Sequence, residues 1–151
     1  MARAGMWTVG MAFAPVGFGV GVVVATGILN EVAARSVATD IAGNWMVVMV
    51  FGAVLFLPGI VFALFGASML WGRTGTVTAI LGLVLLSLPP LLFAAAGIEE
   101  AVGPQRDPYS PSWTARLSLS AALVYALPFV ALVLGNAFAT WMVWSGRAAR
   151  R

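Results

Sequence analysis

No charged side chain interrupts the stretch IAGNWMVVMVFGAVLFLPGIVFALFGASMLWG, which covers residues 41–72. A helix needs about 20 consecutive, mainly apolar residues to cross a bilayer core of about 30 Å, so this stretch is long enough to span a membrane. Eight arginines and five acids bound three more charge-free stretches of similar character, at residues 4–30, 74–98 and 117–146. The sequence therefore predicts an all-α integral membrane protein with four transmembrane helices, at residues 6–29, 44–71, 75–98 and 112–144.

The composition of the chain agrees with this prediction. It is 62% hydrophobic and 9% charged, whereas an average soluble domain is about 45–50% apolar and about 25% charged. Little sequence remains outside the four stretches, so we expect residues 1–151 to form a single domain, a four-helix transmembrane bundle with short loops. Cysteine and histidine are both absent. Since most haem, copper, zinc and iron–sulfur sites need one of these side chains, we expect no cofactor and no metal.

The distribution of charge predicts the orientation of the chain in the membrane. Loops on the cytoplasmic side carry an excess of basic residues. One side of the predicted helices carries arginine and no acid, whereas all five acids lie on the other side, so we expect both termini in the cytoplasm. All basic residues are arginine, which is typical of a GC-rich bacterial genome and indicates the bacterial plasma membrane, and we expect no nucleic-acid partner. The arginines of the cytoplasmic side are Arg3, Arg73, Arg147, Arg150 and Arg151.

Six tryptophans give an independent measure of depth, because the indole ring prefers the headgroup level. Four fall at the predicted inner ends of helices, and two, Trp45 and Trp113, at outer ends. Of the two outer connections, residues 31–43 could form a short interfacial helix. Residues 99–112 contain three prolines and predict an irregular loop.

Each predicted helix carries a stripe of small residues at spacings of four or seven, which places the members of a stripe on one face. In lipid, such faces let helix backbones approach and gain van der Waals contact. The stripes can serve packing within one bundle or docking onto the helices of a partner, and the sequence leaves both interpretations open. The positions are Gly17, Gly21 and Ala25; Gly52, Gly59 and Gly66; Gly75 and Ala79; and Ala131, Gly135 and Ala139.

Each predicted helix also contains proline, which frees the carbonyl four residues earlier and bends the helix. The prolines are Pro15, Pro58, the pair Pro89 and Pro90, and Pro128. All but Pro15 would lie near the middle of the membrane. Kinks at one depth could widen a cavity there, although proline is also more frequent in membrane helices than in soluble ones.

The last predicted helix has a sustained polar line. Its four members share a sector of about 60° at about 100° per residue. The amide of Asn136 needs a partner in hydrocarbon, so it should point into the bundle, towards another subunit, or into a wet cavity, with Ser87 and Thr26 as candidate partners. The four polar residues are Ser118, Tyr125, Asn136 and Thr140.

Apart from Arg116 near the outer end of the last one, no ionisable acid or base lies within a predicted span. Proton relays, ion-coupled carriers and voltage sensors place such groups inside the membrane, and this chain offers none. We therefore expect a non-catalytic structural or accessory subunit of a larger bacterial membrane complex. Its partners would be the lipid bilayer and other transmembrane subunits, in a hetero-complex rather than a homo-oligomer.

Two other functions stay open at this point. One is a homo-oligomeric channel or small transporter, in which outer acids concentrate cations at the mouth and the polar line faces the pore. The other is an enzyme that uses the same acids on lipid or quinone. Adjacent residues on a helix point about 100° apart, which disfavours a shared site, so we expect no enzyme. The acids of the outer mouth are Glu99, Glu100 and Asp107.

Overall fold

The computed structural model describes residues 2–32, 37–70, 72–102 and 119–148. Side chains are described in these segments apart from those of residues 2, 25–32, 37–44, 46, 48–51, 100–102, 119, 121 and 147–148. The segments form four helices, which confirms the all-helical prediction. At 1.5 Å per residue each helix is about 45 Å long, more than the roughly 30 Å of bilayer hydrocarbon. The helices are α1 (Ala2–Val32), α2 (Val37–Ser68), α3 (Arg73–Val102) and α4 (Leu119–Ala148).

The connection between the first two helices differs from the expected interfacial helix. Helix α1 continues to Val32 and α2 begins at Val37, so most of residues 31–43 belong to the two long helices. Charged residues at the ends do not stop a helix whose backbone hydrogen bonds are already propagating. Of the predicted proline-containing loop, residues 99–102 belong to α3, and residues 103–112 lie outside the described residues.

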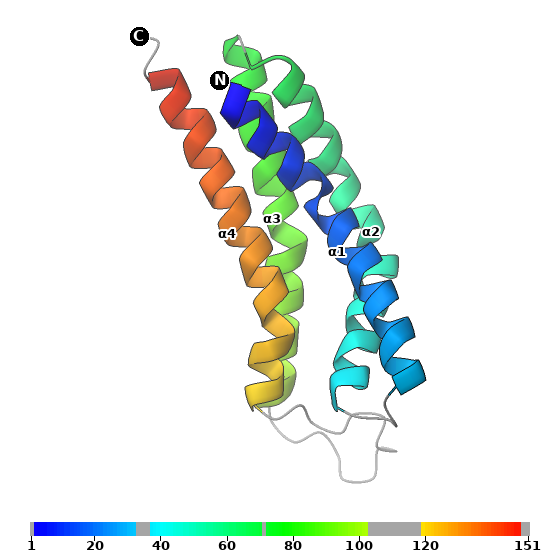
Figure 1. The fold of residues 1–151 in the computed structure, drawn as a ribbon. Helices are drawn as coiled ribbons and strands as arrows, with labels where there is room; N and C mark the ends of the chain where they lie inside the picture. The colour runs from blue at the N-terminus through cyan, green and yellow to red at the C-terminus, as the bar shows by residue number, and fades with distance from the viewer. Residues whose placement is uncertain (1, 33–36, 71, 103–118, 149–151) are drawn as a thin grey trace.

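The four helices lie side by side, and consecutive helices run in opposite directions (Figure 1). Helix α3 packs along α2 and along α4, and α1 packs on α2 and, less extensively, on α4. The start of α1 and the end of α4 lie at the same end of the molecule (Figure 1). Figure 1 also shows that α1 bends about half-way along its length, where Pro15 interrupts the helical hydrogen bonds.

The turn between α2 and α3 is tight and depends on glycine. The Gly72 N–H donates to the carbonyl of Met69 at 3.1 Å, and the Thr76 N–H donates to the carbonyl of Gly72 at 3.2 Å. Gly75 lies so close to the Met69 carbonyl that a Cβ at this position would overlap it. A larger residue at position 75 would therefore force α2 and α3 apart at the turn.

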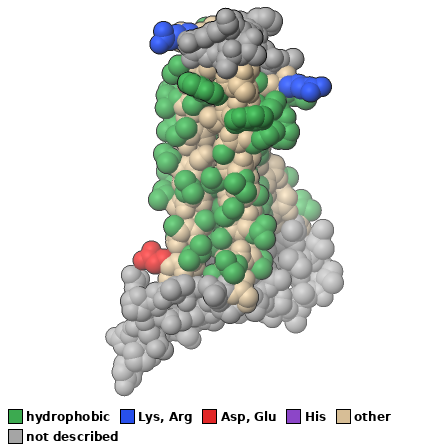
Figure 2. Space-filling model, turned by 90° about the vertical axis from the view of Figure 1, so that its left-hand side faces the viewer, with side chains coloured by type: hydrophobic (Ala, Val, Ile, Leu, Met, Phe, Trp, Pro, Cys, Tyr) green, Lys and Arg blue, Asp and Glu red, His purple; other side chains and the backbone are tan. Residues whose placement is uncertain are grey.

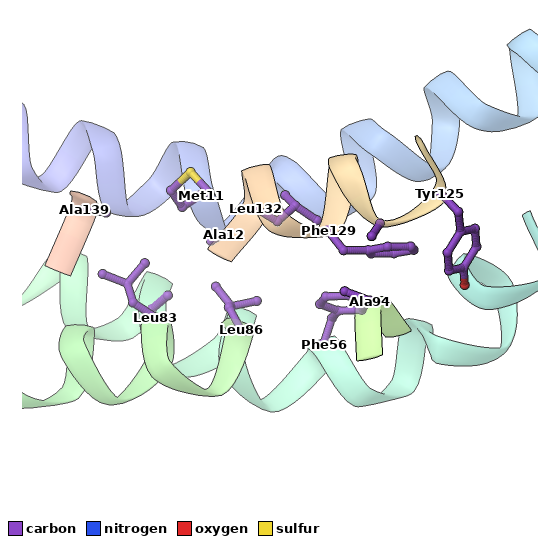
Figure 3. Packing of buried hydrophobic residues seen from close by; sticks show 12 residues of the cluster. Met11, Ala12, Phe56, Leu83, Leu86, Ala94, Tyr125, Phe129, Leu132 and Ala139 are labelled. Atoms are coloured by element: carbon purple, nitrogen blue, oxygen red, sulfur yellow. The ribbon is translucent and has the colours of Figure 1, made fainter. Parts of the chain in front are cut away.

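Buried apolar side chains from all four helices hold the molecule together. In the larger cluster, Met11 and Leu132 face Leu83 and Leu86 (Figure 3). A smaller cluster nearer the α2–α3 turn consists of Ala4, Leu70, Ala79 and Val143.

One aromatic ring lies at the centre of the larger cluster. The ring of Phe129 lies 5.3 Å from that of Tyr125, 5.7 Å from that of Phe93 and 6.0 Å from that of Phe18, measured between centroids. Tilted and edge-on ring pairs of this kind add stability beyond the area that they bury. Aromatic contacts therefore tie α4 to both α1 and α3 at this depth.

Three of the described helices are long and apolar enough to cross a membrane, over Arg3–Val24, Arg73–Glu99 and Ala122–Gly146. The described apolar part of α2 is shorter, Gly52–Ser68. On the face drawn in Figure 2, apolar side chains cover the middle, with arginine at one end and an acidic residue at the other. A large exposed apolar surface is unfavourable in water, whereas lipid chains solvate it well. The structure thus supports a membrane protein.

Candidate functional site

The polar line of α4 faces the inside of the molecule. Asn136 is only 2% exposed, and its Oδ1 atom has no hydrogen-bond partner among the described residues. Thr140 is half-buried and donates its hydroxyl to the backbone carbonyl of Asn136 at 2.8 Å. Tyr125 is buried against Phe129. Ser118, the fourth member, lies outside the described residues.

Of the two hydroxyls expected to serve Asn136, the one whose side chain is described bonds elsewhere, and so does the buried hydroxyl of Thr8. Ser87 donates to the carbonyl of Leu83, one turn earlier on its own helix, at 2.9 Å. Thr8, which is fully buried on α1, donates to the carbonyl of Ala4 at 2.8 Å. The side chain of Thr26 lies outside the described residues. Short hydroxyl side chains in helices commonly bond back in this way, because the carbonyl one turn earlier is always within reach.

A connection between helices that the sequence did not reveal involves Trp45. Its indole N–H donates to the backbone carbonyl of Tyr125 at 3.1 Å, and its ring lies edge-on to that of Phe18, 5.8 Å away. Pro128 has no N–H to donate to the carbonyl of Val124, so the helical hydrogen bonding of this turn is incomplete. Trp45 is therefore half-buried between helices, whereas the sequence suggested only an interfacial anchor.

The glycine stripe of α2 is used within the chain. A Cβ built on Gly59 would lie 2.8 Å from the backbone nitrogen of Leu86, and one on Gly52 would lie 2.8 Å from the ring of Phe93. Gly66 lies against the backbone of Ala79 and is closer still. Gly59 and Gly66 therefore let α2 and α3 approach to backbone contact, and Gly52 leaves room for the ring of Phe93. Here the structure supports packing within the chain rather than docking.

The small residues of α4 are divided between the inside and the outside. Ala139 is fully buried, and a Cβ on Gly135 would lie 2.6 Å from the terminal methyl of Met11 on α1. Ala131, by contrast, is exposed. The buried part of this stripe thus lets α1 approach α4. No other helix covers the exposed Ala131.

The glycines of α1 have surroundings unlike those of the other stripes. A Cβ added at Gly10, Gly17 or Gly21 would meet no atom within 4 Å, and all three glycines are exposed. At about 100° per residue they share a sector of about 40°, roughly opposite the buried residues Thr8 and Val22. We call these three residues the α1 glycine face. The side chain of Ala25 lies outside the described residues, and Gly10, seven positions before Gly17, is a member that the sequence analysis missed.

The acidic mouth is described only in part. Glu99 is exposed near the end of α3. The side chain of Glu100 and the whole of Asp107 lie outside the described residues. Where side chains are described, no three histidines, cysteines or acids come close enough together to hold a metal ion.

The chain matches no known protein family, and comparisons with curated proteins and with solved structures found no similar protein.

Proposed function

We propose that this protein is a non-catalytic accessory subunit of a larger membrane complex, and that it binds a transmembrane helix of a partner protein on the α1 glycine face. The observation that carries the proposal is the open space at Gly10, Gly17 and Gly21. Where α2 and α3 meet, glycines such as Gly59 and Gly82 lie in backbone contact with the neighbouring helix. The α1 glycine face is the same kind of surface without its neighbour.

The physical chemistry of lipid supports this use of the face. Between helices in a bilayer the hydrophobic effect supplies no drive, so association depends on close packing and on small residues that permit it. Glycine also lowers helix stability by about 1 kcal/mol relative to alanine in a helix interior. Three glycines on one outward face thus weaken α1 unless a second helix packs against them.

The proposed location is the plasma membrane of a bacterium, with four spans and both termini in the cytoplasm. Arg3 and Arg73 begin α1 and α3 at one end of the molecule, and Glu99 lies towards the end of α3. This separation supports an orientation in which the arginine end is cytoplasmic.

A pore formed by several copies is less well supported. Such a pore would need the polar line of α4 on an outer surface, where it could face a channel between subunits. Asn136 and Tyr125 are instead buried inside the single chain. We therefore favour the accessory role.

The test is purification of the native protein in a mild detergent, followed by mass spectrometry of the chains that co-purify. We expect one or more other membrane proteins in constant ratio, and we expect Gly17→Leu and Gly21→Leu to lose them. The matched control is Ala137→Leu, which enlarges an exposed small residue on α4. Partner binding that survives both glycine substitutions would refute the proposed surface, and a protein that always purifies alone would refute the proposed function.

A further inference from the structure

Aromatic side chains of α1 and α4 meet near the arginine end of the molecule. The ring of Trp7 lies edge-on to that of Phe138, with the two centroids 5.1 Å apart, and the ring of Phe138 lies 5.7 Å from that of Trp141. All three side chains are exposed, so their rings form a continuous surface along the outside of the contact between the two helices. We call these three residues the aromatic seam.

Arg3 lies next to the aromatic seam. It is one helical turn before Trp7 on α1, which places it about 6 Å nearer the arginine end and about 40° away around the helix. Trp141 lies about 4.5 Å from Phe138 in the same direction, because α4 runs antiparallel to α1 (Figure 1). Arg3 and Trp141 are therefore at about the same depth on two neighbouring helices.

The polar groups of Arg3 and the aromatic seam are all hydrogen-bond donors. A guanidinium has five N–H donors and no acceptor, and each indole has one N–H. Within the described part of the chain, no hydrogen bond or ion pair engages the side chain of Arg3 or the indole N–H of Trp7 or Trp141. This set of donors suits an anion that is rich in oxygen acceptors.

The headgroup of a phospholipid has this chemistry. Its phosphodiester oxygens are negatively charged acceptors, which a guanidinium can bind with two parallel hydrogen bonds. Indole rings favour the headgroup level, where the N–H meets polar groups while the ring contacts the upper part of the acyl chains. A free phosphate ion has no apolar part to lie against the rings, so the combination favours a lipid.

The charge around Arg3 restricts the kind of headgroup. No acid lies at this end among the described residues. The ammonium group of phosphatidylethanolamine would therefore lie beside a guanidinium with no carboxylate to receive it, and like charges repel. The glycerol headgroup of phosphatidylglycerol carries no positive charge and leaves the phosphate to Arg3.

We propose that Arg3 and the aromatic seam form a binding site for the headgroup of an anionic phospholipid in the leaflet at the arginine end. This site borders the proposed partner surface, since Gly10 lies about 10 Å along α1 from Arg3. The experiments therefore use the isolated chain, in which no partner helix is present.

The test is native mass spectrometry of the full chain, released from detergent micelles that contain phosphatidylglycerol and phosphatidylethanolamine in equal amounts and with identical acyl chains. We expect one phosphatidylglycerol molecule to be retained several-fold more often than phosphatidylethanolamine. Arg3→Gln should reduce this preference several-fold, and Arg3→Lys should reduce it less. Equal retention of the two lipids by the wild-type chain would overturn the proposal.

Matched variants separate a site from the general attraction of a basic surface. Arg73→Gln removes the same charge from an exposed position at the start of α3, and it should change the preference little. Trp7→Leu and Trp141→Leu keep the charge and remove an indole, so each should reduce retention, whereas Phe65→Leu at an exposed ring on α2 should not. Equal losses in Arg3→Gln and Arg73→Gln, or unchanged retention in both tryptophan variants, would overturn the proposal.

One further variant separates this site from the proposed partner surface. Gly17→Leu should keep the lipid preference of the isolated chain, although it loses the partner from native membranes. Loss of the lipid preference in Gly17→Leu would place the lipid on the α1 glycine face and overturn the proposal. A chain that never co-purifies with another protein but keeps its preference for phosphatidylglycerol would refute the accessory role and support the lipid site.

Discussion

At the scale of single residues, the most unusual group is the side-chain carbonyl of Asn136. It is buried, and no donor among the described residues reaches its Oδ1 atom. Leaving such an acceptor unpaired costs about 1–3 kcal/mol. We therefore predict that Asn136→Leu, which keeps the branching and the number of side-chain heavy atoms and has no polar atom, leaves the free energy of unfolding in mixed micelles unchanged or raises it by about 1 kcal/mol.

The control for this prediction is Asn136→Asp. A carboxylate at the same position has to be either buried as a charge or protonated, and both states are costly in a low dielectric. This variant should therefore be clearly less stable than the wild-type protein at neutral pH. If Asn136→Leu is instead the strongly destabilised variant, the amide makes a hydrogen bond that stabilises the fold.

A second prediction at this scale concerns Trp45. Its N–H bonds to the Tyr125 carbonyl, while its ring packs on Phe18. Trp45→Phe keeps a ring and removes the donor, so we expect a loss of about 1 kcal/mol in the free energy of unfolding. Trp141→Phe, at a residue that is 60% exposed, is the matched control and should change stability little. Equal effects of the two substitutions would mean that the hydrogen bond contributes nothing.

The polar line of α4 shows how much of the candidate site could be predicted from the sequence. The helical spacing of Asn136 and Tyr125 predicts that they share one face of α4, because 100° per residue is a property of any helix, and both side chains are buried. The direction of that face, and the identity of each partner, depend on how far each neighbouring helix is rotated and shifted. Ser87 was a reasonable partner for Asn136, but its own helix supplied a nearer carbonyl.

At the scale of helices, the glycines fall into two groups with opposite expected responses. Gly82 on α3 lies against the backbone of Ala63 on α2, so a methyl group there overlaps the neighbouring helix. We predict that Gly82→Ala lowers the free energy of unfolding by about 1–3 kcal/mol, the usual cost of overpacking. A circular-dichroism melt in detergent, alongside the chemical unfolding curve, measures the loss.

Gly17→Ala is the matched variant on α1. Nothing lies within 4 Å of the added methyl, and alanine stabilises a helix relative to glycine, so the isolated chain should keep or slightly gain stability. If Gly82→Ala and Gly17→Ala destabilise the isolated chain equally, the difference in packing between these two helix faces is not real.

The stripes themselves were visible in the sequence, but their use was not. A spacing of four or seven puts Gly52, Gly59 and Gly66 on one face just as it does Gly17 and Gly21. The first set meets α3, and the second meets no other part of the described chain. Spacing contains no information about which face of a helix turns inward when all faces are apolar, so only the packed structure separates the two sets.

At the scale of the whole molecule, the start of α1 and the end of α4 share one end of the fold (Figure 1). The proposed orientation places that end in the cytoplasm. The natural absence of cysteine makes the test simple, because single cysteines can be introduced without a background. We predict that Ser110→Cys reacts with an impermeant maleimide on intact cells and that Ala149→Cys reacts only after the cells are opened. The reverse pattern would contradict the orientation.

Much of the fold could be predicted from the sequence, since the charge-free stretches predict four helices and each is found. The boundaries were less accurate. Helix α2 begins at Val37, ahead of the predicted start at residue 44, because helical hydrogen bonding continues past the apolar stretch that marks a span. An apolar groove between α1 and α2, lined by residues that include Pro15, Gly19 and Phe56, was not foreseen, since it depends on how these two helices pack.

The central claim is that the α1 glycine face binds a helix of another protein, and a photocrosslink tests it most directly. Phe13 is 54% exposed beside this face and Phe65 is 58% exposed on α2, so each can be replaced by a photoreactive phenylalanine analogue of similar shape. After illumination of native membranes, we predict a discrete adduct between position 13 and one other transmembrane protein, and none from position 65. No protein adduct from position 13, or an adduct only with a second copy of this chain, would contradict the claim.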